Sequence, residues 1–171
     1  MSELTSFEQA LGRLTMKYSI VETIAAVAVW ALLKLDLTDG TVITSKLGLK
    51  DRLNLLIELG PSKGLSQQTI SALVEIRQEF ENNLTRRRNE LIHGLYVENV
   101  RLQQPNGTWV DADRLSISFP RSRSAGGAKA TFTSIEEIQS VTNEITTQAE
   151  KLSGALRGAG LISENIALSP R

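Results

Sequence analysis

The sequence predicts a mainly α-helical protein: an antiparallel helical bundle of four to five helices, with a small β insertion between the third and the last helix. Apolar residues recur at helical spacing up to residue 93 and again over 135–157, whereas the stretch between them alternates. Short turn segments join the helices, which favours antiparallel packing. The 171 residues are about one domain in length. We therefore expect one domain over 1–158, with the insertion at about 95–132 and a loosely ordered tail over 159–171.

The first predicted helix is long. Helical spacing of apolar residues starts at Phe7, after a cap near Ser6, and continues through the apolar run Ile24–Leu33. That run is too short to span a bilayer and is typical of a buried helix. We expect the helix to end near Lys34, because Asp36–Gly40 is rich in turn-forming residues.

Two further helices are predicted before the insertion. One covers about 45–59 and is stopped by Gly60–Pro61, a pair that is typical just after a helix end. Ser66 is a good cap for the other, which we expect to run without interruption over 66–93 and to end at Gly94.

The character of the chain then changes. Alternating β-prone residues predict short strands at 95–103, 108–110, 115–119 and 129–132. The stretch Arg121–Gly127 is polar and predicts a loop, which is either a mobile basic arm or a bare surface loop. Ser134 and Glu137 form a capping box for the last helix, over about 135–157.

Composition narrows the functional classes. The chain has no cysteine and a single histidine, which removes disulfide frameworks, cysteine nucleophiles and paired-histidine zinc sites. Its 19 basic and 19 acidic residues balance, but residues 86–129 carry a net charge of +4. We expect no metal, no cofactor and no membrane span. With no basic region ahead of an apolar stretch at the N-terminus, the expected location is the cytoplasm.

The third helix has two distinct faces. At 100° per residue the core face consists of Leu73, Ile76, Phe80, Leu84 and Leu91. The opposite side carries a polar line of Asn82, Arg86, Asn89 and His93. Arg88 lies about 140° around the helix from His93, so within one helix the two approach each other only from the side. This geometry indicates a site completed by a second copy of the helix in a dimer.

Arginine and histidine without an acidic metal cluster suit metal-independent RNA cleavage. A neutral imidazole can take the proton of the ribose 2′-OH, and a guanidinium can offset the charge that builds on the phosphate. The products would be a 2′,3′-cyclic phosphate and a 5′-hydroxyl, and DNA would not be cut. Two simpler explanations remain: a histidine suits a helix C-terminus, and adjacent arginines are often only a solvated face.

The motif Arg88-Asn89-x-x-x-His93 at the end of a long helix resembles the Arg-x(4–6)-His signature of HEPN domains. The resemblance implies an α-helical bundle, a homodimer with the motif at its interface, and a metal-independent endoribonuclease of a toxin–antitoxin or phage-defence system. It implies that Arg88 and His93 are catalytic, that Asn89 supports them, and that an antitoxin protein is a partner. Some HEPN-like domains are non-catalytic, so an RNA-binding or protein-interaction module is the alternative. The residues expected to bind substrate are Asn82, Arg86, Arg87, Arg121 and Arg123.

Overall fold

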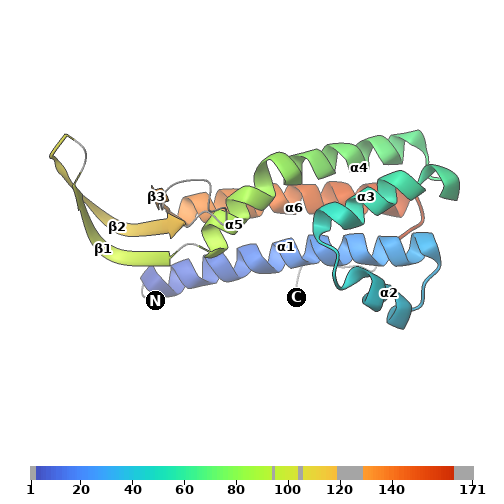
Figure 1. Cartoon of the computed structure of the whole chain (residues 1–171), viewed down its shortest axis with the longest axis horizontal. Coiled ribbons are helices and arrows are strands. Elements are labelled where there is room, and N and C mark those ends of the chain that lie inside the picture. The colour runs from blue at the N-terminus through green and yellow to red at the C-terminus, as the bar shows by residue number, and fades with distance from the viewer. Residues whose placement is uncertain (1–2, 94, 104–105, 119–128, 164–171) are drawn as a thin grey trace.

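Three long helices form the body of the molecule (Figure 1). The computed structural model describes residues 3–93, 95–103, 106–118 and 129–163. Helix α1 (Glu3–Leu33) lies beside α6 (Ile135–Gly158), and both run in the same direction. The chain of α4 (Gln67–Glu79) and α5 (Thr85–His93) runs in the opposite direction. Helix α3 (Leu49–Leu59) packs against α1 and α4, at the end of the bundle where α1 stops and α4 begins.

The predicted helical fold is confirmed by what these helices bury. All five residues expected on the core face of the third helix are buried. Six apolar residues at helical spacing on the last helix are buried as well: Ile138, Val141, Ile145, Ala149, Leu152 and Leu156. Two of the predicted caps are confirmed, since Ser66 accepts a hydrogen bond from Thr69 N at 3.1 Å and Ser134 accepts one from Glu137 N at 3.2 Å. Side-chain periodicity and capping together therefore define the main bundle.

Helix α1 ends at Leu33, close to the predicted end at Lys34, but the prediction that Asp36–Gly40 forms a turn is wrong. Residues Leu37–Thr44 form a short helix, α2, and the expected turn residue Asp36 is its N-cap, accepting from Asp39 N at 2.8 Å. Gly40 lies inside α2 and faces Trp30 so closely that a Cβ on it would be 2.6 Å from the indole. Packing on a large aromatic side chain outweighs the poor helix propensity of this stretch.

Helix α2 is held in place by polar contacts as well. Trp30 Nε1 donates to Thr44 Oγ1 at 3.0 Å. Arg52 of α3 donates to the backbone oxygens of Glu22 (2.8 Å) and Thr44 (3.0 Å), which joins α1, α2 and α3. Because α2 takes residues 37–44, the next helix begins at Leu49 and not near residue 45 as predicted.

The predicted uninterrupted helix over 66–93 is also corrected. A π-helical turn at Phe80–Leu84, called here the π segment, separates α4 from α5. Such a turn holds one residue more than an α-helical turn and is frequent at functional sites. Counting α4, the π segment and α5 as one interrupted helix, the described residues contain five helices and the single 3-10 turn Pro61–Lys63.

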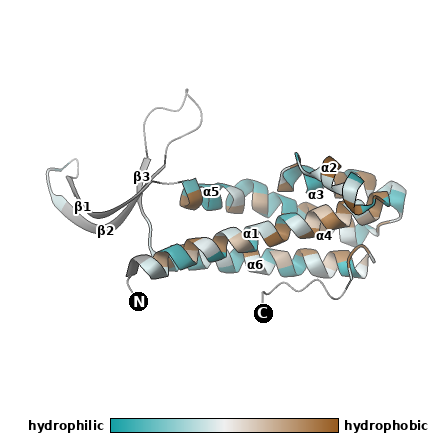
Figure 2. Cartoon of the chain, turned by 90° about the horizontal axis from the view of Figure 1, so that it is seen from below, coloured by the Kyte–Doolittle hydropathy of each residue, from teal (hydrophilic) through white to brown (hydrophobic). Residues whose placement is uncertain are grey.

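Three strands follow α5. Strand β1 (Leu95–Gln103) pairs antiparallel with β2 (Trp109–Ser118), which pairs antiparallel with β3 (Lys129–Phe132). The β1–β2 hairpin projects beyond the bundle, at the end where α5 stops and α1 begins (Figures 1 and 2). His93 therefore lies at the junction between the helices and the sheet.

Helix α1 and the residues that follow α6 both differ from what the sequence predicts. By length and hydropathy alone Thr5–Leu33 could cross a membrane, but it is the central core helix, with Leu14, Val21 and Ala25 fully buried. It begins at Glu3, so Ser6 lies inside it and does not cap it. After α6 the chain turns back, and Ile162 of the expected tail packs into the core.

Candidate functional site

The three consecutive arginines of α5 point to three different partners. Arg86 is exposed and donates to Glu90 Oε1 and Oε2 at 3.0 and 3.3 Å, one turn further along the helix. Arg87 is partly buried and pairs with Glu144 of α6 at 2.7 Å. Among the described residues Arg88 has no carboxylate partner. It is therefore the one cation of the triplet whose charge is not already balanced by a neighbour.

Arg88 packs against α1. Its guanidinium carbon lies 4.8 Å from the centroid of the Tyr18 ring, a cation–π distance. Its Nη1 donates to Asn89 Oδ1 at 2.9 Å. Its Nε is buried without a hydrogen-bond partner in the described structure, but the same is true of Arg52 and Arg77. The orphan N–H therefore does not distinguish Arg88, whereas the aromatic contact does.

Tyr18 contacts both Arg88 and the π segment. The tyrosine is buried, and its ring meets Phe80 edge-on, with centroids 5.9 Å apart and planes at 77°. Its hydroxyl lies 3.2 Å from Thr85 Oγ1. Thr85 directly follows the π segment and Phe80 opens it, so Tyr18 contacts the helix on both sides of the widened turn. Burial raises the pKa of the Tyr18 hydroxyl, and the hydrogen bond with Thr85 opposes this shift.

The polar line expected along the third helix is only partly free. Asn82, Arg86 and His93 are exposed, and Asn89 is half-buried where it accepts from Arg88. His93 lies in the last turn of α5 and makes no hydrogen bond or ion pair with any described residue. It is thus an accessible imidazole on the same helix as Arg88, whose guanidinium packs on α1 and donates to Asn89.

Two expected substrate-binding residues, Arg121 and Arg123, lie outside the described residues. Sequence reasoning missed Tyr18 and Thr85 as parts of the site. A tyrosine among core positions was a usable signal, because a buried hydroxyl normally finds a partner. A second signal was the position of Arg88, four residues after Leu84 and three before Leu91, which places it on the core face of the helix.

This arrangement offers a fixed cation, an oriented amide and an accessible imidazole. The described residues contain no group of three or more histidine, aspartate or glutamate side chains that could hold a metal ion. In this arrangement His93 can transfer a proton and an arginine can stabilise negative charge.

Comparison with models of known protein families found no match, and searches of curated proteins and of solved structures found no relative.

Proposed function

We propose that this chain is a metal-independent endoribonuclease of HEPN type that acts as a cytoplasmic homodimer, as a toxin or a defence component. The observation that carries the proposal is the separation of roles on α5. Arg86 and Arg87 are neutralised by Glu90 and Glu144, whereas Arg88 is held by Tyr18 and Asn89 and His93 stays accessible. A fixed guanidinium and an unpartnered imidazole are the two groups that cleavage through the 2′-OH requires.

The proposed reaction needs both copies of the helix. The neutral imidazole of one His93 takes the proton of the ribose 2′-OH, and the 2′-oxygen attacks the adjacent phosphorus. The bond from phosphorus to the 5′-oxygen breaks, and that oxygen takes a proton from the imidazolium of the second copy. Arg88 offsets the charge on the non-bridging oxygens. Arg88 and His93 lie on different sides of α5, so the guanidinium of one copy would serve the imidazole of the other.

Further features of the proposal concern partners. We propose that β1, β2 and β3 act as a small β insertion that extends the RNA-facing surface beside His93. Asn82, on the exposed side of the same helix, would contact substrate. An antitoxin protein, the class of partner that the HEPN resemblance implies, would bind the chain and silence it.

A non-catalytic RNA-binding or protein-interaction module is the second candidate. The observation in its favour is that each of the three arginines already has a partner within the chain: Glu90, Glu144 and Tyr18. In that case the helix end would bind phosphate or a partner protein without turnover.

The test is incubation of purified protein with RNA in the presence of EDTA. We expect cleavage that leaves 2′,3′-cyclic phosphate ends and falls by about 100-fold or more in His93→Ala, the contribution typical of a general base. Arg88→Gln should lose cleavage as well, whereas the control variant Arg157→Gln, in the last turn of α6, should retain it. RNA binding without cutting would favour the module. Cleavage that persists in both His93→Ala and Arg88→Gln would refute the ribonuclease assignment.

A further inference from the structure

Helix α1 buries only one of its sides within the chain. Its most apolar 18-residue stretch is only 44% buried, although the same helix forms the centre of the core. Tyr18 faces α5, whereas Thr23, about 140° further around the helix, is exposed. An apolar helix with one uncovered side is a candidate interaction surface.

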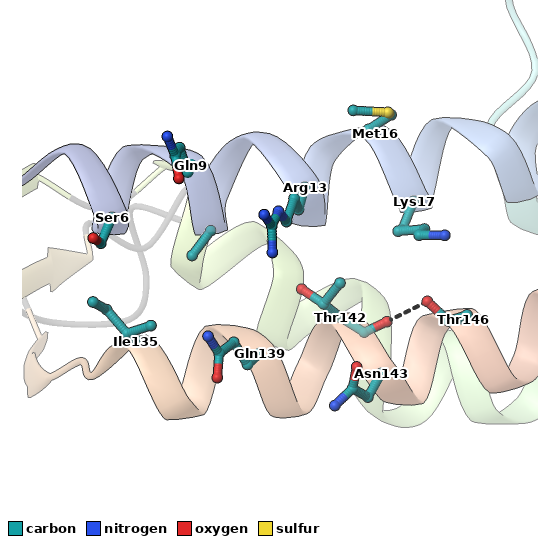
Figure 3. A pocket seen from close by; sticks show the side chains of 11 residues that line it. Ser6, Gln9, Arg13, Met16, Lys17, Ile135, Gln139, Thr142, Asn143 and Thr146 are labelled. Carbon is teal, nitrogen blue, oxygen red and sulfur yellow. Dashed lines mark hydrogen bonds between the residues drawn. The ribbon is translucent and has the colours of Figure 1, made fainter. Parts of the chain in front are cut away.

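The uncovered side of α1 is a stripe without charged residues. Six exposed or half-buried positions fall within about 100° of one another around the helix. Arg13 borders them, and Figure 3 shows its side chain directed toward α6, whereas Met16 points away from α6. A helix side that faces only water is normally rich in charged residues, so this side is unusual for a solvated face. The six positions, called here the outer stripe, are Gly12, Met16, Ile20, Thr23, Val27 and Ala31.

The polar atoms on this side of α1 can be covered at little cost. The hydroxyl of Thr23 donates to Ser19 O at 2.9 Å. Thr15, at the edge of the stripe, donates to Leu11 O at 3.0 Å. Because both hydroxyl protons are already used within the helix, covering them leaves no unsatisfied donor. A Cβ on Gly12 would meet nothing within 4 Å, so another helix can approach closely there.

Helix α2 enlarges the uncovered apolar area. It lies beside the C-terminal half of α1, where Gly40 meets Trp30 (Figure 1). In the part of the chain that the structure describes, five large apolar side chains are exposed, and four of them belong to these two helices. Their concentration on adjoining helices marks this region as an interaction surface. The four are Met16, Leu37, Val42 and Ile43.

The outer stripe matches itself in the antiparallel direction. If Met16 of one copy is set opposite Val27 of another, Ile20 comes opposite Thr23, and the two remaining members of the stripe also meet. Every position of the stripe then faces another position of the stripe. A two-fold interface between identical chains requires this kind of self-matching, because the same patch serves both copies.

The charges at the two ends of α1 favour the same arrangement. Glu8 lies near its start and Lys34 directly follows its end, and both are exposed without an ion pair to any described residue. In an antiparallel pair Glu8 of each copy comes beside Lys34 of the other, whereas a parallel pair would bring like charges together. Opposite charges at opposite ends therefore fit a second copy of α1 better than a lipid surface.

We propose that the outer stripe of α1, together with the exposed apolar residues of α2, is an antiparallel two-fold interface with a second copy of this chain. It lies on the side of α1 away from Tyr18, so it leaves α5 free to meet another copy. The inference goes beyond the proposed function, because it concerns a separate interface and does not depend on RNA cleavage.

Crosslinking tests this interface directly, because the chain has no cysteine of its own. In the proposed pair the two copies of Thr23 lie about 4.5 Å apart along the helix axis, so oxidation of Thr23→Cys should give a covalent dimer as the main product. Thr147→Cys is the matched control and should stay monomeric. Thr147 is also an exposed threonine that donates to a backbone oxygen one turn back, but it lies on α6.

Sedimentation velocity measures the same association without a crosslink. Thr23→Arg should weaken it about tenfold or more, because two guanidinium groups would meet at the two-fold axis. Thr147→Arg should leave it unchanged. Glu8→Lys should weaken association about fivefold, since each dimer holds two such pairs, and Glu8→Lys/Lys34→Glu should restore it. The thermal unfolding of Thr23→Arg should match that of Thr147→Arg, because both positions are exposed.

Three outcomes would overturn the proposal. One is equal crosslinking of Thr23→Cys and Thr147→Cys. Another is crosslinking through Asn82→Cys alone, which would leave α5 as the interface between copies. The third is flotation of the chain with anionic vesicles that Thr23→Arg abolishes, which would identify a lipid surface as the occupant. The ribonuclease assignment is tested separately, by cleavage and by His93→Ala.

Discussion

The guanidinium of Arg88 lies over the ring of Tyr18, 4.8 Å from its centroid, and joins α5 to α1 beside the π segment. The same tyrosine meets Phe80 through its ring and Thr85 through its hydroxyl. One side chain of α1 thus fixes both the widened turn and the arginine that follows it.

A double-mutant cycle should detect this contact as a coupling energy. Tyr18→Leu and Arg88→Met each remove one partner, and we expect a coupling of about 1 kcal/mol, since the pair is largely desolvated. The measurement is urea unfolding of the two single variants and the double variant. The matched cycle of Tyr18→Leu with Arg86→Met should be additive within about 0.5 kcal/mol, because Arg86 pairs with Glu90 instead. Equal couplings in both cycles would show that the Arg88 contact is not specific.

Tyr18 should make the fold sensitive to alkaline pH. Burial raises the pKa of its hydroxyl above the ordinary value of 10.0, so the folded state favours the neutral phenol. The corresponding stabilisation is complete below the unfolded pKa and is lost as the pH rises through the folded pKa. We therefore expect the free energy of unfolding to fall more steeply above about pH 10 in the unmodified chain than in Tyr18→Phe.

Tyrosinate absorbance provides the direct check. The chain has two tyrosines, Tyr18 and Tyr96, so Tyr18→Phe leaves one titrating phenol. The difference between the two titration curves should show a midpoint above that of free tyrosine. A midpoint at or below pH 10.0, the ordinary value, would contradict the burial of Tyr18 in solution.

Gly40→Ala should destabilise the chain by about 1–3 kcal/mol, the usual cost of overpacking. A Cβ at this position would meet the Trp30 indole at 2.6 Å, so α2 would have to move away from α1. Gly154→Ala in α6 is the matched control, since a Cβ there meets nothing within 4 Å and alanine favours a helix by about 0.5–1 kcal/mol. Thermal unfolding of the two variants should shift in opposite directions, and a neutral Gly40→Ala would refute the close packing of α2.

The ion pair between Arg87 and Glu144 should make only a modest contribution to stability. Both side chains are partly exposed, so Arg87→Gln is expected to cost about 1 kcal/mol or less in urea unfolding. Exchanging the charges in Arg87→Glu/Glu144→Arg should restore most of what Arg87→Glu alone loses. If the exchanged double variant regains stability but not RNA binding, Arg87 contacts RNA in addition to its ion pair with Glu144. If the variant regains both stability and RNA binding, Arg87 has a structural role alone.

The main helices could be predicted because their information is local. Apolar spacing and the caps Ser66 and Ser134 mark their faces and starts. Helix α2 could not be found in this way, because residues 37–44 contain glycine and threonines and become helical by packing on Trp30. The π segment could not be predicted either, because Phe80 and Leu84 are four residues apart, a spacing that fits a regular α-helix equally well.

The candidate site also has one part that local sequence predicts and one part that depends on contacts with distant residues. The exposed side of α5, with Arg86 and His93, follows from helical geometry within one segment. The contact of Arg88 with Tyr18 joins residues far apart in the chain, and the partner of Arg87 lies on α6. Spacing within α5 gives the direction of each side chain but not what it meets there.

The π segment also sets a rotational phase between the two halves of its helix. Because this turn absorbs one extra residue, deleting one residue from Phe80–Leu84 would return the turn to α-helical geometry and leave Arg88 in its place over Tyr18. If the same residues formed a regular α-helix with none deleted, every later residue would turn by about 100° around the axis, and Arg87 would take the place of Arg88. The identity of the side chain that meets Tyr18 thus depends on the width of one turn, which can change without altering any residue of the Arg-Asn-x-x-x-His motif.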